Sequence, residues 1–157
     1  MSDVQCGHEK TLTGLTSALA GANAIYGAGM LDSGLTLDYG QLVLDNELAA
    51  MIRQFVLGIE VSDETLLLDE IHAIGSSGDF MSTEATLAHM RDCSTPRLLD
   101  RRVYEDWQAD GGRDAIEKAR QQAREILRNH KPQALDPDVA GEIRRIVDEA
   151  DASLSQA

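Results

Sequence analysis

The chain has 157 residues, of which 43% are hydrophobic but only 4% aromatic, and its formal net charge is −13. This length suffices for one ordinary domain with a sizeable core. The negative charge argues against nucleic acid or an anionic membrane surface as a partner, because binding phosphates requires clustered cations. The chain has no apolar run near the ~20 residues that span a bilayer and no targeting segment, so we expect no membrane partner and a cytoplasmic protein.

The first third of the chain predicts a helix, a strand and a loop. Apolar residues at helical spacing predict a helix over residues 9–20, which Gly21 ends. The run 22–26 is the best strand candidate, because it is short and apolar on both faces, like a strand buried between helices. A glycine-rich loop with polar side chains follows, at Gly27, Gly29, Asp32, Ser33, Gly34 and Thr36. The loop after a parallel strand is where ligands bind, so this loop is a candidate active-site loop, although it matches no nucleotide-binding fingerprint.

The remainder of the chain is predicted to be helical. A second helix over 39–57 has six apolar residues on its predicted buried face: Leu42, Leu44, Leu48, Met51, Ile52 and Phe55. Five more helices are predicted, over 64–74, 82–92, 100–107, 114–129 and 137–152. A lone buried strand would leave its backbone groups unpaired. The pattern therefore indicates either an all-helical protein or part of a larger sheet.

The cysteines and histidines do not predict a metal site. Cys6 and Cys93 lie far apart without a CxxC motif, which predicts free thiols in a reducing compartment. Cys6 and His8 are zinc-ligand types, but structural zinc takes four ligands, and the other candidates are too scattered to complete the set by spacing. We therefore expect no metal ion.

Short motifs along nearly the whole chain, from about residue 3 to residue 154, together resemble the C-terminal part of the trimethylamine:corrinoid methyltransferase family. No motif is diagnostic alone, but their order and spacing match. The motifs are GHEKT at 7–11, ALAGAN at 18–23, IYGAGML at 25–31, SGLT at 33–36, QLVLDN at 41–46, DETL at 63–66 and LDR at 99–101.

The resemblance implies an α/β fold, namely a C-terminal fragment of a TIM (β/α)8 barrel. The fragment would be mostly helical, with one or two short parallel strands and added C-terminal helices. A complete barrel needs ~250 residues, so this chain would hold roughly the last third of a family member. Residues 1–61 would form late barrel βα units with the glycine-rich loop at the catalytic face. Residues 62–157 would form helices that pack outside the barrel, in one incomplete domain.

The resemblance also implies an activity, which is transfer of a methyl group from trimethylamine, or a related tertiary or quaternary amine, to the Co(I) corrinoid of a partner protein. The chain itself would bind no cofactor tightly. Its partners would be the corrinoid protein, the upstream part of the methyltransferase and a second copy of the chain, because uncovered apolar faces associate. The alternative is a non-catalytic helical oligomerisation or interaction module derived from the family.

The resemblance places the catalytic residue upstream of residue 1. In methanogen-type members, a pyrrolysine encoded by an in-frame amber codon lies shortly upstream of the segment that matches residues 3–10. We hypothesise that this chain is the reading frame downstream of such a codon, or a truncated homologue, and that the fragment alone is inactive.

Binding a methylated amine requires aromatic or carboxylate groups that attract a cation. Tyr26, Asp32 and Ser33 are therefore the candidate substrate-binding residues, and Gly27 and Gly29 are the candidate cofactor contacts. Two structural alternatives stay open. Tyr26 is equally predicted as a core tyrosine with a hydrogen-bonded hydroxyl, and Asp32 as a turn or capping aspartate.

Overall fold

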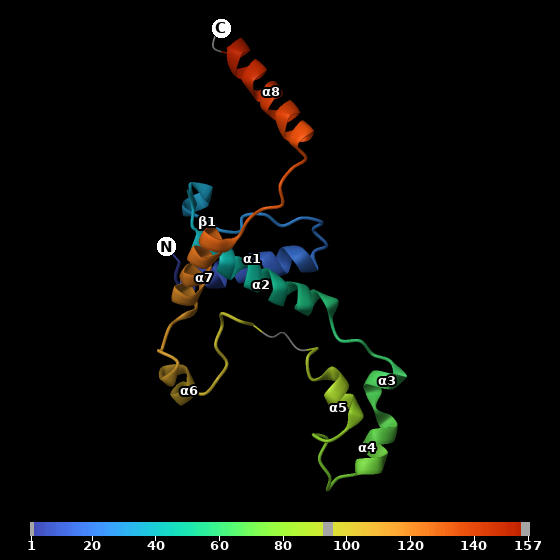
Figure 1. Cartoon of the computed structure of the whole chain (residues 1–157). Helices are drawn as coiled ribbons and strands as arrows, with labels where there is room; N and C mark the ends of the chain where they lie inside the picture. Colours follow the sequence, from blue (N-terminus) through green and yellow to red (C-terminus); the bar gives the residue numbers. More distant parts are fainter. Residues whose placement is uncertain (1, 93–95, 155–157) are drawn as a thin grey trace. The chain divides into compact units, whose positions relative to one another are not determined.

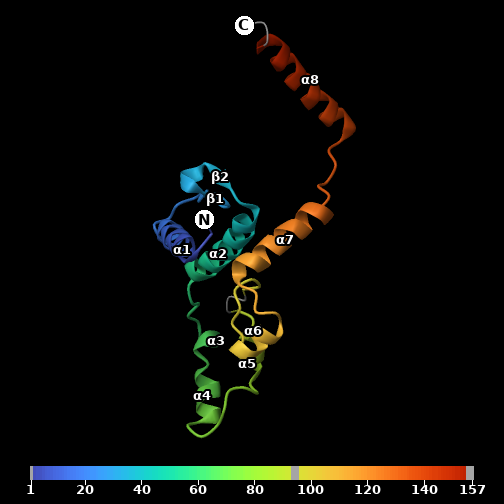
Figure 2. The same cartoon turned by 90° about the vertical axis from the view of Figure 1, so that its left-hand side faces the viewer.

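The computed structural model describes residues 2–92 and 96–154, which form helices and one short two-stranded sheet (Figures 1 and 2). The helices are α1 (Val4–Leu19), α2 (Tyr39–Leu57), α3 (Asp63–Leu66), α4 (Leu68–Ile74), α5 (Glu84–His89), α6 (Tyr104–Ala109), α7 (Ala115–Asn129) and α8 (Pro137–Leu154). The chain divides into two compact units, residues 1–126 and 127–157. No helix in the described ranges is both long and apolar enough to cross a membrane. Cys93 lies outside these ranges.

Helices α1 and α2 lie side by side in the first unit (Figure 1). Each begins at an aspartate that caps it: the Asp3 carboxylate accepts the Cys6 N–H, and the Asp38 carboxylate accepts the Gln41 N–H. These caps satisfy backbone donors that a helix start otherwise leaves unpaired. The prediction of a helix over 39–57 is confirmed, whereas α1 begins earlier than the predicted residue 9 because of its cap at Asp3.

The sheet differs from the predicted one. Strands β1 (Met30–Leu31) and β2 (Thr36–Leu37) pair antiparallel, with Met30 opposite Leu37, around the short 3-10 turn η1 (Asp32–Gly34). The predicted strand over 22–26 is wrong, since that segment is irregular and exposed. Its apolar residues have no neighbouring strand among the described residues, whereas the turn closes a local hairpin. The two short strands are therefore not parallel, and a barrel fragment stays a prediction.

The core of the first unit lies between α2, α7 and the segment before α6. Leu44, Leu98 and Ala119 are buried together, and Val43, Leu99, Ala115 and Ile116 pack against them. Helices α2 and α7 approach closely at Gly40, where a Cβ would lie 2.6 Å from the Arg120 Cγ. The predicted face of α2 is only partly right, because Phe55 is 63% exposed and Leu42 is also exposed.

A single carboxylate fixes the segment that carries Leu98. Glu47 on α2 accepts the backbone N–H groups of Arg97, Leu98 and Leu99, each at an N···O distance of 2.9 Å. Three consecutive donors therefore converge on one side chain. This contact joins positions about 50 residues apart in the sequence and places Leu98 in the core.

The predicted helix over 64–74 is interrupted. Leu67 adopts a left-handed conformation with φ 53°, which separates α3 from α4. Ser62 and Thr65 cap α3 reciprocally, since each side-chain oxygen accepts the backbone N–H of the other residue. Thr65 takes the role that Glu or Gln usually fills in a capping box.

Asp100 does not cap α6, which begins at Tyr104 rather than at the predicted residue 100. The Asp100 carboxylate instead accepts hydrogen bonds from Arg102, at 2.7 and 2.9 Å, and from Lys118 at 2.8 Å. The hydrogen bonds from Arg102 and then Lys118 hold the pKa of Asp100 far below its ordinary value. The Tyr104 and Trp107 rings of α6 lie against each other, with their centroids 5.5 Å apart.

The second unit contains α8. The predicted helix over 137–152 is confirmed and continues to Leu154. Its apolar face is exposed, at positions Val139, Ile143, Ile146 and Val147. Arg145 binds Glu142 and Glu149 across successive turns, which supports the helix from its polar side.

Candidate functional site

The glycine-rich loop between α1 and α2 is held by a buried polar cluster, which we call the Asp45 cluster and which consists of Lys10, Gln41, Asp45 and the backbone of Gly27 and Gly29. One Asp45 oxygen accepts the Lys10 ammonium at 2.5 Å and the Gly29 N–H at 2.8 Å. The other accepts the Gln41 side-chain amide at 2.6 Å. Lys10 also donates to the Gly27 carbonyl at 3.1 Å. Both helices therefore contribute side chains that bind the loop backbone.

The burial of the cluster is unusual for polar side chains. Asp45 is 8% exposed and Gln41 only 2%. Buried charges are tolerated when they are paired and hydrogen-bonded, which this arrangement achieves for Asp45. The loop backbone at Gly29 is also closely packed, because a Cβ there would lie 2.9 Å from both Leu37 and Leu42.

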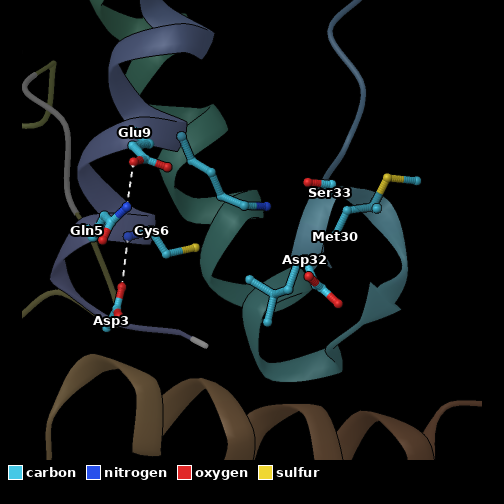
Figure 3. Close-up of a pocket in the computed structure, with 10 residues that line it drawn as sticks. Asp3, Gln5, Cys6, Glu9, Met30, Asp32 and Ser33 are labelled. Atoms are coloured by element: carbon cyan, nitrogen blue, oxygen red, sulfur yellow. Dashed lines mark hydrogen bonds between the residues drawn. The ribbon is translucent and has the colours of Figure 1, made fainter.

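A pocket of about 380 Å³ lies between the start of α1 and the β1–β2 hairpin (Figure 3). The lining residues come from two segments: Asp3, Gln5, Cys6, Glu9 and Lys10 from α1 and its cap, and Met30, Leu31, Asp32, Ser33 and Gly34 from the hairpin. Two of the predicted substrate-binding residues, Asp32 and Ser33, are thus brought together in the wall of one cavity.

Asp32 and Ser33 both adopt left-handed backbone conformations, with φ of 51° and 54°. Such conformations are uncommon for residues other than glycine, and they cost of order 1 kcal/mol each. Here they form the tight turn η1 between β1 and β2 and place both residues at the pocket. The interpretation of Asp32 as a turn residue is therefore confirmed, and its role in substrate binding stays a prediction.

The pocket lining carries more negative than positive charge. Among the lining residues that the structure describes, Asp3, Glu9 and Asp32 contribute carboxylates, while the one ammonium, that of Lys10, is paired with Asp45. Asp3 also caps α1, and Glu9 accepts a hydrogen bond from the Gln5 side chain (Figure 3). The arrangement favours a small cation over an anion, because the lining cation is already neutralised.

Cys6 adds a free thiol to the pocket lining, as the sequence predicts. Burial raises the pKa of the Cys6 thiol above its ordinary value, so the thiol is protonated at neutral pH. The described residues contain no group of three or more His, Cys, Asp or Glu side chains arranged to hold a metal ion.

The other candidates do not line this pocket. Tyr26 is 93% exposed, so its interpretation as a core tyrosine is wrong. Gly27 and Gly29 use their carbonyl and amide groups to bind Lys10 and Asp45. Their role as cofactor contacts stays a prediction.

Sequence reasoning missed Lys10, Gln41 and Asp45 as site residues. A signal was present, because Gln41 and Asp45 occur four residues apart, on one face of a helix whose neighbouring residues are apolar. Polar residues at such spacing on an apolar face indicate a buried hydrogen-bonded pair. The contact with Lys10, 35 residues away, leaves no local pattern.

The amino-acid sequence matches a family of known proteins. The family model described as trimethylamine methyltransferase (MTTB) matches residues 1–155. The trimethylamine methyltransferase MttB of Desulfitobacterium hafniense is 48% identical over 149 residues, which cover 95% of this chain and 30% of that protein. Trimethylamine methyltransferase MttB2 of Methanosarcina mazei is 42% identical over 154 residues, which cover 98% and 31%.

A relative with a different named substrate is more distant. The glycine betaine methyltransferase of Desulfitobacterium hafniense is 29% identical over 147 residues, which cover 92% of this chain and 30% of that protein. The chain spans about 30% of the length of these curated relatives and corresponds to their C-terminal portion. The match over nearly the whole chain shows that it belongs to the trimethylamine methyltransferase (MTTB) family.

Proposed function

We propose that the chain is the C-terminal part of a methyltransferase that moves a methyl group from trimethylamine, or a related tertiary or quaternary amine, to the Co(I) corrinoid of a partner protein. The observation that carries this proposal is the family match over residues 1–155. The whole enzyme would be a cytoplasmic TIM barrel, and its catalytic residue would lie in the part of the family that this chain does not match.

Within this proposal, the pocket at the hairpin binds the amine. Trimethylamine is protonated at neutral pH, and a quaternary amine is always charged, so the ligand is a small cation with an apolar surface. The Asp32 carboxylate and the other two lining carboxylates attract the charge, while Met30 and Leu31 contact methyl groups. The Ser33 hydroxyl can accept an N–H from a protonated tertiary amine.

The corrinoid stays on the partner protein in this proposal. The pocket of about 380 Å³ accommodates a methylated ammonium but not a corrin ring. When bound to the partner, the Co(I) corrinoid would supply the nucleophile for the methyl group, and the amine nitrogen would keep the electron pair of the broken C–N bond. The contribution of this chain is to bind the amine and orient a methyl group toward the partner. Tyr26 is exposed outside the pocket lining and is not part of the amine site in this proposal.

A chimeric enzyme tests the proposal. The matching segment of the Desulfitobacterium hafniense trimethylamine methyltransferase is replaced by this chain, and methyl transfer to a corrinoid protein is followed by the visible spectrum of the corrinoid. The chimera should be active, and Asp32→Asn should lower kcat/KM for trimethylamine about ten-fold, which corresponds to about 1.4 kcal/mol. The matched control Asp69→Asn, an exposed aspartate on α4, should leave kcat/KM unchanged.

Two results would contradict the proposal. A well-folded chimera without methyl transfer would show that the chain does not supply the enzyme's C-terminal part. Equal activity of Asp32→Asn and Asp69→Asn would remove Asp32 from the amine site. If the 157-residue chain instead folds and self-associates alone while the chimera is inactive, the interaction-module alternative is favoured.

A further inference from the structure

We propose that Lys10, Gln41 and Asp45 act as positioning residues that hold the glycine-rich loop, residues 27–34, in the conformation that forms the amine pocket. The three side chains come from the two packed helices. Lys10 and Asp45 bind the loop backbone at Gly27 and Gly29, and Gln41 holds Asp45 through its side-chain amide. The assignment of the pocket to the amine rests on the proposed function, whereas the holding of the loop does not.

The contacts of Asp45 make it the centre of the arrangement. Its two oxygens accept three hydrogen bonds, from Lys10, from the Gly29 N–H and from Gln41. A carboxylate that is 8% exposed depends on these donors, because no solvent replaces a lost one efficiently. Loss of any one donor therefore loosens the others as well as the loop.

Lys10 connects the cluster to the pocket directly. Its ammonium bridges Asp45 and the Gly27 carbonyl, while its side chain forms part of the pocket lining. The ion pair also keeps the Lys10 charge away from an incoming cation. Removing Asp45 would therefore leave an uncompensated ammonium beside the pocket and repel the ligand.

The loop geometry transmits the effect to Asp32 and Ser33. Gly29 directly precedes β1, and the turn that carries both pocket residues follows β1 immediately. Backbone contacts also support the hairpin, because the Asp38 N–H donates to the Gly29 carbonyl and the Met30 N–H to the Gly27 carbonyl. These backbone bonds fix the local turn, whereas the Asp45 cluster joins the start of the loop to side chains of α1 and α2 by hydrogen bonds.

Amide hydrogen exchange and ligand titration of the 157-residue chain, both by NMR, test the proposal. Trimethylammonium chloride is the ligand, and the Met30 methyl resonance reports its binding. Lys10→Met and Asp45→Asn should each speed exchange at Gly29 about ten-fold and weaken binding about five-fold, whereas Lys10→Arg should retain most of both properties. The control Lys118→Met breaks a comparable lysine–aspartate pair elsewhere in the same unit and should change neither property.

The variant Gln41→Met keeps the ion pair between Lys10 and Asp45 but removes one donor to Asp45. It therefore tests the proposal even if Lys10→Met and Asp45→Asn unfold. It should speed exchange at Gly29 by a smaller factor while the circular dichroism spectrum stays that of the wild type. Unchanged Gly29 exchange in folded variants would overturn the proposal, and so would acceleration by one common factor throughout α1 and α2. If the wild-type chain does not bind trimethylammonium but exchange at Gly29 responds as expected, the proposed amine site fails and the positioning role stands.

Discussion

Replacing Glu47 by glutamine should destabilise the first unit, because the side chain keeps nearly the same shape but loses hydrogen bonds to the backbone. In the wild type, one carboxylate oxygen accepts the N–H groups of Arg97 and Leu98, and the other accepts those of Leu98 and Leu99. A glutamine side chain has one oxygen and one NH₂ group in the same space. The NH₂ group would face a backbone donor, so at least one backbone N–H loses its partner.

The magnitude follows from the energies of such bonds. A hydrogen bond to a charged group contributes about 1.5–3 kcal/mol, and an unpaired donor away from water costs about 1–3 kcal/mol. Because Glu47 is only half-buried, water offsets part of this loss. We expect Glu47→Gln to lower the free energy of unfolding by about 2 kcal/mol, which is roughly a 30-fold change in the folded-to-unfolded ratio.

Urea unfolding followed by circular dichroism measures this change, and amide exchange at Leu98 localises it. Glu105→Gln, at an exposed position on α6, is the matched control and should shift the free energy of unfolding by less than about 0.5 kcal/mol. If Glu47→Gln is as stable as this control and its Leu98 amide exchanges at the wild-type rate, the carboxylate does not hold the segment and our reasoning is refuted.

Three further predictions concern single positions. Gly29→Ala, at φ 77° and with its new Cβ 2.9 Å from two side chains, should cost about 3 kcal/mol in urea unfolding, whereas Gly27→Ala, at φ 107° in open space, should cost about 1 kcal/mol. The hydrogen bond to Asp92 raises the pKa of His89 above its ordinary value of 6.5. The stabilisation from this pair is therefore fully present below pH 6.5 and is lost as the pH rises through the raised pKa of His89. In Asp92→Asn, the NMR signals of the His89 ring should return toward an ordinary histidine titration. The pKa of Asp100 is lowered, so the stabilisation that its ionised carboxylate contributes is present above pH 3.8 and is lost only as the pH falls well below that value. The NMR signal of the Asp100 carboxyl carbon should therefore still be that of the ionised form at about pH 3.

Local signals determined how well the helices were predicted. Helix α2 was predicted to the residue because an aspartate cap precedes it and Gly58, at φ 72°, ends it. Helix α6 was placed too early because Asp100 has the residue type of a cap but pairs with Arg102 and Lys118. The residue type shows that a side chain can cap a helix, but tertiary contacts decide whether it caps the helix or pairs with other residues.

The candidate site was predicted in part for the same reason. Asp32 and Ser33 were chosen from their place in a glycine-rich loop, and they do line a pocket. Tyr26 was chosen because the segment before it looked like a buried strand, and without that strand its ring is exposed. Lys10 and Asp45 meet across 35 residues, which periodicity within one helix does not encode.

The contact of Glu47 with residues 97–99 closes a long loop of the chain. This contact and the hydrogen bond from the Gln54 side chain to the Asp92 carbonyl bring together the two ends of one long loop, which contains α3, α4 and α5. The entropy of closing a loop grows only with the logarithm of its length, so doubling the length of this loop would cost about 0.6 kcal/mol. This loop is therefore the part of the first unit where insertions and deletions should lower the free energy of unfolding least, because the core around Leu44, Leu98 and Ala119 stays intact.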